Sequence, residues 1–112
     1  MKVLLIDDQR EAPHIKSMYG LDVTHVARSY DEGIKALQEG GWDVLLLDHD
    51  LNSYPDGAEK TGSDIMKFLQ DNQNLLPQSI IFVTMNPGGR RRMQGILHDI
   101  QKQQSMSKKE ET

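Results

Sequence analysis

Three short runs of the chain are apolar at every position, and this feature restricts the possible folds more than any other. They are residues 3–6, 44–47 and 80–83. Strands without polar alternation are typical of a parallel sheet that is covered on both faces. A fourth run, residues 23–27, mixes apolar and polar side chains, which predicts a strand at the edge of the sheet. The sequence therefore predicts four strands in one sheet.

Helical patterns separate these strands. Ser29 and Glu32 have the spacing of a capping box, Gly40 and Gly41 end that helix, and a short helix is expected after Pro13. Apolar residues at helical spacing indicate two further helices: Ile65, Met66, Phe68 and Leu69, and then Met93, Ile96, Leu97 and Ile100. Alternating strands and helices with right-handed crossovers predict an α/β fold, a doubly wound parallel sheet with helices on both faces.

The composition limits the class of protein. The 112 residues suit one domain, which we expect to span residues 1–102, followed by a polar, disordered tail at 103–112. The net charge of −4 argues against bulk DNA binding, and the lack of cysteine excludes disulfides and thiolate metal sites. No apolar run approaches the roughly 20 residues of a membrane span, and the apolar start is too short for a signal peptide. We therefore expect a cytoplasmic protein with no membrane partner.

Acidic residues follow two of the apolar strands. Asp7 and Asp8 come after the first strand, Asp48 follows the third, and Thr84 ends the fourth. The carboxyl ends of parallel strands lie along one edge of the sheet, where ligands bind. Carboxylates gathered there repel one another unless a cation lies between them, and Mg²⁺ prefers oxygen ligands. The alternative is that each aspartate only caps a turn. We favour a Mg²⁺ or Mn²⁺ site at Asp7, Asp8 and Asp48.

The segment after the fourth strand has the features of an anion site. Asn86 suits a helix N-cap, Pro87 suits the first helical position, and residues 88–89 are glycines that allow a ligand to approach the backbone. Arg90 and the arginines at 91–92 would oppose the helix dipole, and a bound anion would reverse that penalty. The alternative is an ordinary basic surface or a weak nucleic-acid contact.

Two further features follow the third strand. His49 is a candidate general acid or base, with Asp50 as its orienting carboxylate; alternatively His49 caps the strand end or faces solvent. The long polar segment at residues 51–62 is either a lid over the site or a disordered insertion, and its departure directly after Asp48 favours the lid.

Three motifs resemble the receiver domains of bacterial response regulators. They are Leu4-Leu5-Ile6-Asp7-Asp8, Leu45-Leu46-Leu47-Asp48 and Ile81-Phe82-Val83-Thr84. The resemblance implies a flavodoxin-like sheet in the order 2-1-3-4, with Mg²⁺ at the acidic pair and at Asp48. It also implies phosphorylation of Asp48 and a contact from Thr84 to the phosphoryl group. Receivers continue with a fifth strand that carries a lysine, which we expect to be absent here.

A second resemblance is closer, to the receiver-derived family proposed to process cyclic phosphates. Its motifs D-D-x-R-P-A-P, L-D-H-D-L, G-T-G-x-D and N-P-x-G-R-x-x-M match the runs that begin at Asp7, Leu47, Lys60 and Asn86. Glu11 replaces a proline and Lys60 a glycine of the motifs. The resemblance implies catalytic roles for Asp48, His49 and Asp50, and phosphate contacts from Arg10, Thr84, Asn86 and Arg90.

The sequence thus favours Mg²⁺-dependent binding or processing of a phosphate ester, with a cyclic phosphate of a nucleotide or of an RNA end as the class of ligand. The expected partner is a phosphate-containing small molecule or a nucleic-acid end. Two alternatives stay open: a signalling receiver phosphorylated on Asp48, and an inactive receiver-like interaction module of cellular or viral origin.

Overall fold

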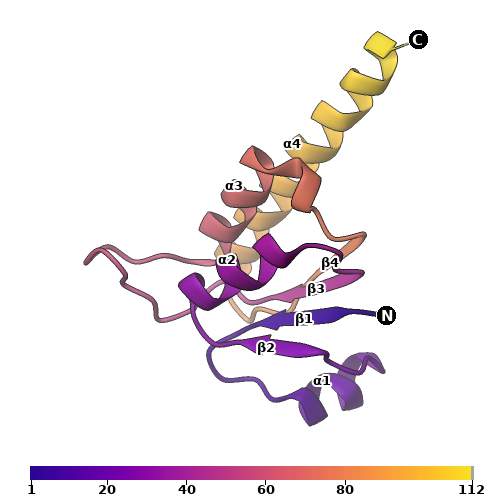
Figure 1. Cartoon of the computed structure of the whole chain (residues 1–112). Coiled ribbons are helices and arrows are strands. Elements are labelled where there is room, and N and C mark those ends of the chain that lie inside the picture. The colour runs from indigo at the N-terminus through magenta and orange to yellow at the C-terminus, as the bar shows by residue number, and fades with distance from the viewer. Residues whose placement is uncertain (112) are drawn as a thin grey trace.

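A computed structural model describes residues 1–111 of the chain, with side chains described through Met106. Strands and helices alternate along it (Figure 1). The elements are β1 (Val3–Ile6), α1 (Ala12–Tyr19), β2 (His25–Ala27), α2 (Tyr30–Glu39), β3 (Val44–Leu47), α3 (Gly62–Asp71), the 3₁₀ turn η1 (Gln73–Leu75), β4 (Ser79–Phe82) and α4 (Pro87–Glu111). The expected βαβαβαβα order is confirmed.

All four strands form one parallel sheet in the order β2-β1-β3-β4, which confirms the predicted topology. In register, Leu5 of β1 lies beside Val26 of β2 and Leu46 of β3, and Leu46 lies beside Ile81 of β4. Over residues 1–111 no fifth strand joins the sheet, so β4 is an edge strand. The strand ends carrying Asp7, Asp48 and Thr84 therefore all lie at one edge.

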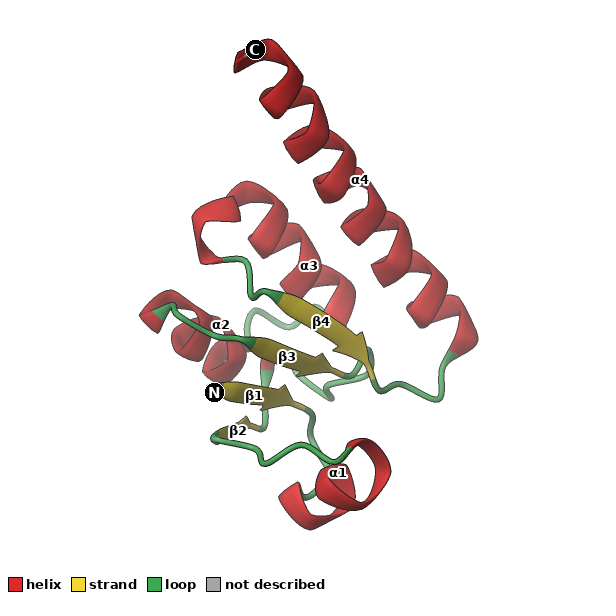
Figure 2. Ribbon diagram, turned by 90° about the vertical axis from the view of Figure 1, so that its right-hand side faces the viewer, coloured by secondary structure: helices red, strands yellow, loops and turns green. Residues whose placement is uncertain are grey.

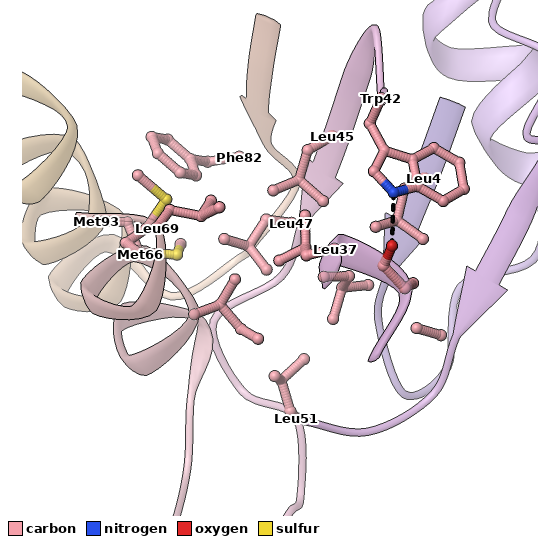
Figure 3. Packing of buried hydrophobic residues seen from close by; sticks show 14 of the residues in the cluster. Leu4, Leu37, Trp42, Leu45, Leu47, Leu51, Met66, Leu69, Phe82 and Met93 are labelled. Atoms are coloured by element: carbon pink, nitrogen blue, oxygen red, sulfur yellow. Dashed lines mark hydrogen bonds between the residues drawn. The ribbon is translucent and has the colours of Figure 1, made fainter. Parts of the chain in front are cut away.

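The sheet is covered on both faces, as its apolar strands require. One face packs against α2, α3 and α4 in a core that includes Leu47, Leu37, Met66 and Met93 (Figure 3). On the other face, Ile15 of α1 packs against alternate strand residues. The helix α4 extends far beyond the sheet (Figure 2). The helices on both sides bury the strands and leave their carboxyl ends free for a site.

Local signals fix where the helices begin and end. Ser29 Oγ accepts a hydrogen bond from the Glu32 backbone N–H at 3.2 Å, which confirms the predicted cap of α2. At α3, Thr61 and Asp64 cap each other's backbone in a capping box. Gly40, with φ near +73°, ends α2 in a conformation that glycine adopts most readily.

The last helix is longer than its apolar stripe. α4 runs to Glu111, so residues 103–111 continue the helix, and Thr112 lies outside the described residues. The glutamines and lysines of this segment are good helix formers, which accounts for the helical continuation. The separate domain boundary at residue 102 stays a prediction. No helix among residues 1–111 is both long and apolar enough to cross a membrane.

Candidate metal and phosphate site

The three predicted metal ligands meet at the carboxyl edge of the sheet. Asp7, Asp8 and Asp48 each offer a carboxylate oxygen, and these oxygens lie within 4.8 Å of one another. Asp7 is fully buried, Asp48 is 7% exposed and Asp8 is half-buried. Three negative charges that lie this close together and are largely shielded from solvent favour a bound cation.

The chain after β1 turns around the Asp7 carboxylate. Asp7 Oδ1 accepts hydrogen bonds from the backbone N–H groups of Gln9 and Arg10, both at 2.9 Å. This is the usual way in which an aspartate initiates a turn. It uses one oxygen of the side chain for structure and leaves Oδ2 to the Arg10 guanidinium.

The Arg10 guanidinium lies beside the carboxylates of Asp7 and Asp48. Its Nη1 lies 2.8 Å from Asp7 Oδ2 and 3.6 Å from Asp48 Oδ2. The Arg10 carbonyl in turn accepts a 2.6 Å hydrogen bond from Arg28 Nη1, and Arg28 Nη2 pairs with Glu11 at 3.0 Å. The motif placed Arg10 near phosphate, but nothing in the sequence pointed to Arg28, a single arginine after β2.

The surroundings of the Asp48 carboxylate disfavour its ionised form. Burial raises the pKa of Asp48, and the nearby Asp7 charge raises it further. Hydrogen bonds from Thr84 and from the His49 backbone N–H, together with the Arg10 charge, lower this pKa without cancelling the rise. A carboxylate that is difficult to ionise beside a second negative charge is one that a metal ion would stabilise.

The cluster opens into a solvent-accessible hollow of about 420 Å³. Its lining combines acidic, basic, amide and hydroxyl groups: Asp8, Gln9, Arg10, Asp48, Asp50, Thr84, Met85 and Asn86. Gln9 and Met85 are the two lining residues that sequence reasoning missed, because neither type carries a signal of its own. The hollow is large enough for a phosphate group and its first substituent next to the carboxylates.

His49 lies behind this hollow and does not line it. The imidazole is 4% exposed, with Nδ1 3.0 Å from Asp50 Oδ1 and Nε2 3.1 Å from Ser63 Oγ. Since a carboxylate only accepts, Nδ1–H donates to Asp50, and in that tautomer Nε2 can accept the Ser63 hydroxyl. A Cβ on Gly89 would lie closer than 3.0 Å to three ring atoms, so α4 seals the ring from above.

Asp50 is the member of the His-Asp pair that reaches solvent. Its side chain is 60% exposed, and Asn86 Nδ2 donates to its two oxygens at 3.4 and 3.3 Å. His49 and Asn86 together hold this carboxylate at the rim of the hollow. The structure therefore brings Asp50 and Asn86 to the acidic cluster and keeps the His49 ring out of it.

The start of α4 is occupied by groups of its own. Asn86 Oδ1 accepts from the Gly89 N–H at 3.0 Å, and the Asn86 carbonyl accepts from the Arg90 N–H at 2.9 Å. The Arg90 guanidinium donates to the carbonyls of Phe82 and Thr84, at 3.1 and 2.6 Å. Arg90 thus binds the free edge of β4 and does not line the hollow, so a direct phosphate contact from Arg90 stays a prediction.

The long segment at residues 51–62 is organised away from the hollow. Ser53 and Lys60 form an antiparallel bridge at its base, and Ser53 Oγ accepts the Tyr30 N–H at the start of α2. The segment projects beside α2 (Figure 1) and supplies none of the residues that line the hollow. It is an anchored loop in this structure, and the interpretation as a lid stays a prediction.

Comparisons with known proteins bear on this arrangement. The profile of the family described as "Cyclic-phosphate processing Receiver domain" matches residues 1–99. Among solved structures, the selenomethionine derivative of the REC domain of AraT, a response regulator from Geobacillus stearothermophilus, is similar at 16% sequence identity. That alignment covers 95% of this chain and 97% of the other, with a TM-score of 0.42. No curated protein sequence matches the chain.

Proposed function

The chain belongs to the family of cyclic-phosphate processing receiver domains, and on that premise we propose that its acidic hollow binds Mg²⁺ or Mn²⁺ and processes a phosphate ester. The substrate class is a cyclic phosphate on a nucleotide or on an RNA end. One observation carries the proposal: Asp7, Asp8 and Asp48 gather within 4.8 Å at the side of an open hollow.

The residues present fit a hard divalent cation. Three carboxylate oxygens within 4.8 Å match an ion that takes oxygen ligands at about 2.0–2.1 Å and keeps several waters. The open hollow leaves room for those waters and for a phosphate oxygen. The absence of cysteine and the two occupied nitrogens of His49 argue against softer metals at this site.

The charges also support a metal-dependent reaction. Asp8, Asp48 and Asp50 line the hollow, Asp7 lies behind them, and Arg10 is the cation among the lining residues. A phosphate anion entering this set alone would be repelled. A bound Mg²⁺ would neutralise part of the acidic charge and polarise the phosphoryl oxygens.

The chain's own residues would supply binding and proton transfer. Arg10 has a planar guanidinium that suits two phosphate oxygens, and Thr84 lies beside Asp48 on the hollow. Asp50, held by His49 and Asn86, would orient an attacking water and accept its proton. His49 then acts as a positioning residue, since its ring does not reach the hollow.

A second candidate function is phosphorylation of Asp48 in a signalling receiver. Residues 1–111 form no fifth strand to carry a lysine, which argues against it, but Arg10 Nη1 lies 3.6 Å from Asp48 Oδ2 and offers a cation at the acceptor. Arg10 would stabilise a phosphoryl group there as the lysine does in receivers. The two functions share the metal site and differ in the acceptor of the phosphoryl group, which is water in the first and Asp48 in the second.

A single ³¹P NMR experiment separates these functions. The protein is incubated with 2′,3′-cyclic nucleotides, with an oligonucleotide ending in a 2′,3′-cyclic phosphate, and with acetyl phosphate, each with Mg²⁺, with Mn²⁺ or with EDTA. We expect metal-dependent conversion of a cyclic phosphate to a monoester. Asp48→Asn and Asp50→Asn should abolish it, while Asp56→Asn, a change in the exposed loop, should not.

Other results have equally direct meanings. A stoichiometric adduct from acetyl phosphate that requires Asp48, with no turnover of cyclic phosphates, would establish the signalling function instead. Metal binding without turnover or adduct on any of these substrates would favour an interaction module. No metal binding at millimolar concentrations would remove the basis of both catalytic proposals.

A further inference from the structure

Arg10 lies between two of the three carboxylates that a metal ion would use, those of Asp7 and Asp48. Asp7 Oδ1 is already bonded to two backbone N–H groups, and Asp48 Oδ1 accepts the His49 N–H at 2.8 Å. On Asp7 and Asp48 the oxygen that accepts no backbone N–H is Oδ2, and Asp8 offers a third carboxylate. The two Oδ2 atoms face Arg10 Nη1, at 2.8 Å on Asp7 and 3.6 Å on Asp48.

A divalent cation and the guanidinium would compete for these oxygens. A metal bound at about 2.1 Å from Asp7 Oδ2 would lie no more than about 5 Å from Nη1, where the two positive groups repel each other. Both cations would draw on the charge of the same carboxylates. Their mutual repulsion therefore favours displacement of the guanidinium when the metal binds.

The backbone of Arg10 stays in place while its side chain moves. Its N–H is held by Asp7 Oδ1 at 2.9 Å, and its carbonyl is held by Arg28 Nη1 at 2.6 Å. Movement is thus confined to the side chain, which is 22% exposed and lines the hollow. The way out leads into that hollow, toward Asp50 and Asn86, where the phosphate would lie.

We infer that Arg10 is an internal counter-ion that a divalent cation displaces, so that metal binding releases the guanidinium to bind the phosphate. This inference rests on the proposed function and adds an order to it: metal first, then phosphate. Before metal binds, Arg10 keeps the acidic cluster partly neutral. After metal binds, the same side chain becomes a phosphate ligand, and its planar fork matches two phosphate oxygens.

The inference predicts opposite effects of one substitution on two ligands. Arg10→Gln removes the competing cation, so Mn²⁺ and Mg²⁺ should bind on the order of tenfold more tightly than to the wild type. The same variant should bind inorganic phosphate more weakly in the presence of saturating Mg²⁺. Arg10→Lys keeps a cation at the carboxylates and should bind metal with nearly wild-type affinity. A purely structural role for Arg10 would weaken both ligands together.

Titration calorimetry with MnCl₂ and MgCl₂, followed by phosphate, measures both affinities on the full chain. Arg92→Gln is the matched control, because Arg92 is exposed on α4 and outside the lining of the hollow. NMR of the Arg10 Nε–Hε group gives a second readout, and we expect its signal to move as Mg²⁺ saturates the wild type. Amide spectra of each variant establish that it is folded.

Equal or weaker metal binding by folded Arg10→Gln would overturn the inference, as would an Arg10 Nε–Hε signal that does not respond to saturating metal. Either result, together with retained turnover of a cyclic phosphate, would leave the proposed function intact. An absence of metal binding in both the wild type and the variants would overturn the inference and the proposed function together.

Discussion

Asp48→Asn should make the metal-free protein more stable, because it removes a buried charge that its surroundings oppose. The Asp48 carboxylate lies within 4.8 Å of both Asp7 and Asp8, and each such pair costs about 3.5 kcal/mol at an effective dielectric constant of about 20. Its attraction to Arg10 at 3.6 Å offsets about 4.6 kcal/mol. The balance is unfavourable by about 2 kcal/mol, before the desolvation of Asp48 is added.

The amide that replaces the carboxylate keeps the local structure. Its carbonyl oxygen can still accept the His49 backbone N–H, and its volume is nearly unchanged. We therefore expect Asp48→Asn to raise the free energy of unfolding by about 2 kcal/mol in EDTA, with a Tm about 5–10 °C higher. Asp56→Asn, in the exposed loop, should change stability by less than about 0.5 kcal/mol.

Urea and thermal unfolding in EDTA and in Mg²⁺ provide the assay. Mg²⁺ at 100 times its Kd should stabilise the wild type by about 2.7 kcal/mol and the variant much less, so the gap between them should close or reverse. A variant that is less stable than the wild type in EDTA would refute the reasoning. It would mean that the Arg10 pair and the hydrogen bonds outweigh the repulsion within the cluster.

The remaining predictions concern pH, packing and the edge of the sheet. The folded-state pKa of Asp48 is raised, so protonation of this group stabilises the wild type as pH falls from 7 toward about 3.9, the ordinary pKa of an aspartate. The stability advantage of Asp48→Asn in thermal melts should therefore shrink over that range. Gly89→Ala should cost about 1–3 kcal/mol in urea unfolding because its Cβ overlaps the His49 ring, whereas Gly95→Ala, with nothing within 4 Å, should gain about 0.5–1 kcal/mol. Equal effects at both glycines would contradict this packing. Arg90→Ala should cost about 1.5–3 kcal/mol through the lost bonds to Phe82 and Thr84, while exposed Arg91→Ala should be nearly neutral.

The fold could be predicted from the sequence because the apolar strands restrict the possible architectures. Runs such as residues 44–47 bury both faces and require a parallel sheet with helices on each side, and the caps at Ser29 and Gly40 mark the helix ends directly. Residues 103–111 have no apolar stripe to indicate a packed helix, yet their polar side chains favour helical backbone. Pattern alone therefore identified the packed part of α4 and missed its extension.

The sequence predicted which types of residue form the site better than it predicted where each side chain lies. Strand ends brought Asp7 and Asp48 together, because parallel topology fixes where strand ends lie. Nothing along the chain reveals which way a side chain turns: His49 points into the interface between α3 and α4, and its neighbour Asp50 points to the hollow. Likewise, the sequence suggests that Arg90 is a free charge at the start of a helix, whereas its guanidinium donates to the backbone carbonyls of Phe82 and Thr84.

Two arginines occupy significant positions in the four-stranded sheet that residues 1–111 form. The edge of β4 leaves backbone carbonyls without a neighbouring strand, and the two guanidinium donors of Arg90 bind those of Phe82 and Thr84. In receivers the fifth strand also supplies a cation to the acidic site, and here Arg10 supplies one from the turn after β1. On this turn the guanidinium lies at the two carboxylate oxygens where we propose that a metal ion competes with it. Among residues 1–111, Arg90 thus caps the edge of β4 and Arg10 supplies a cation to the acidic cluster.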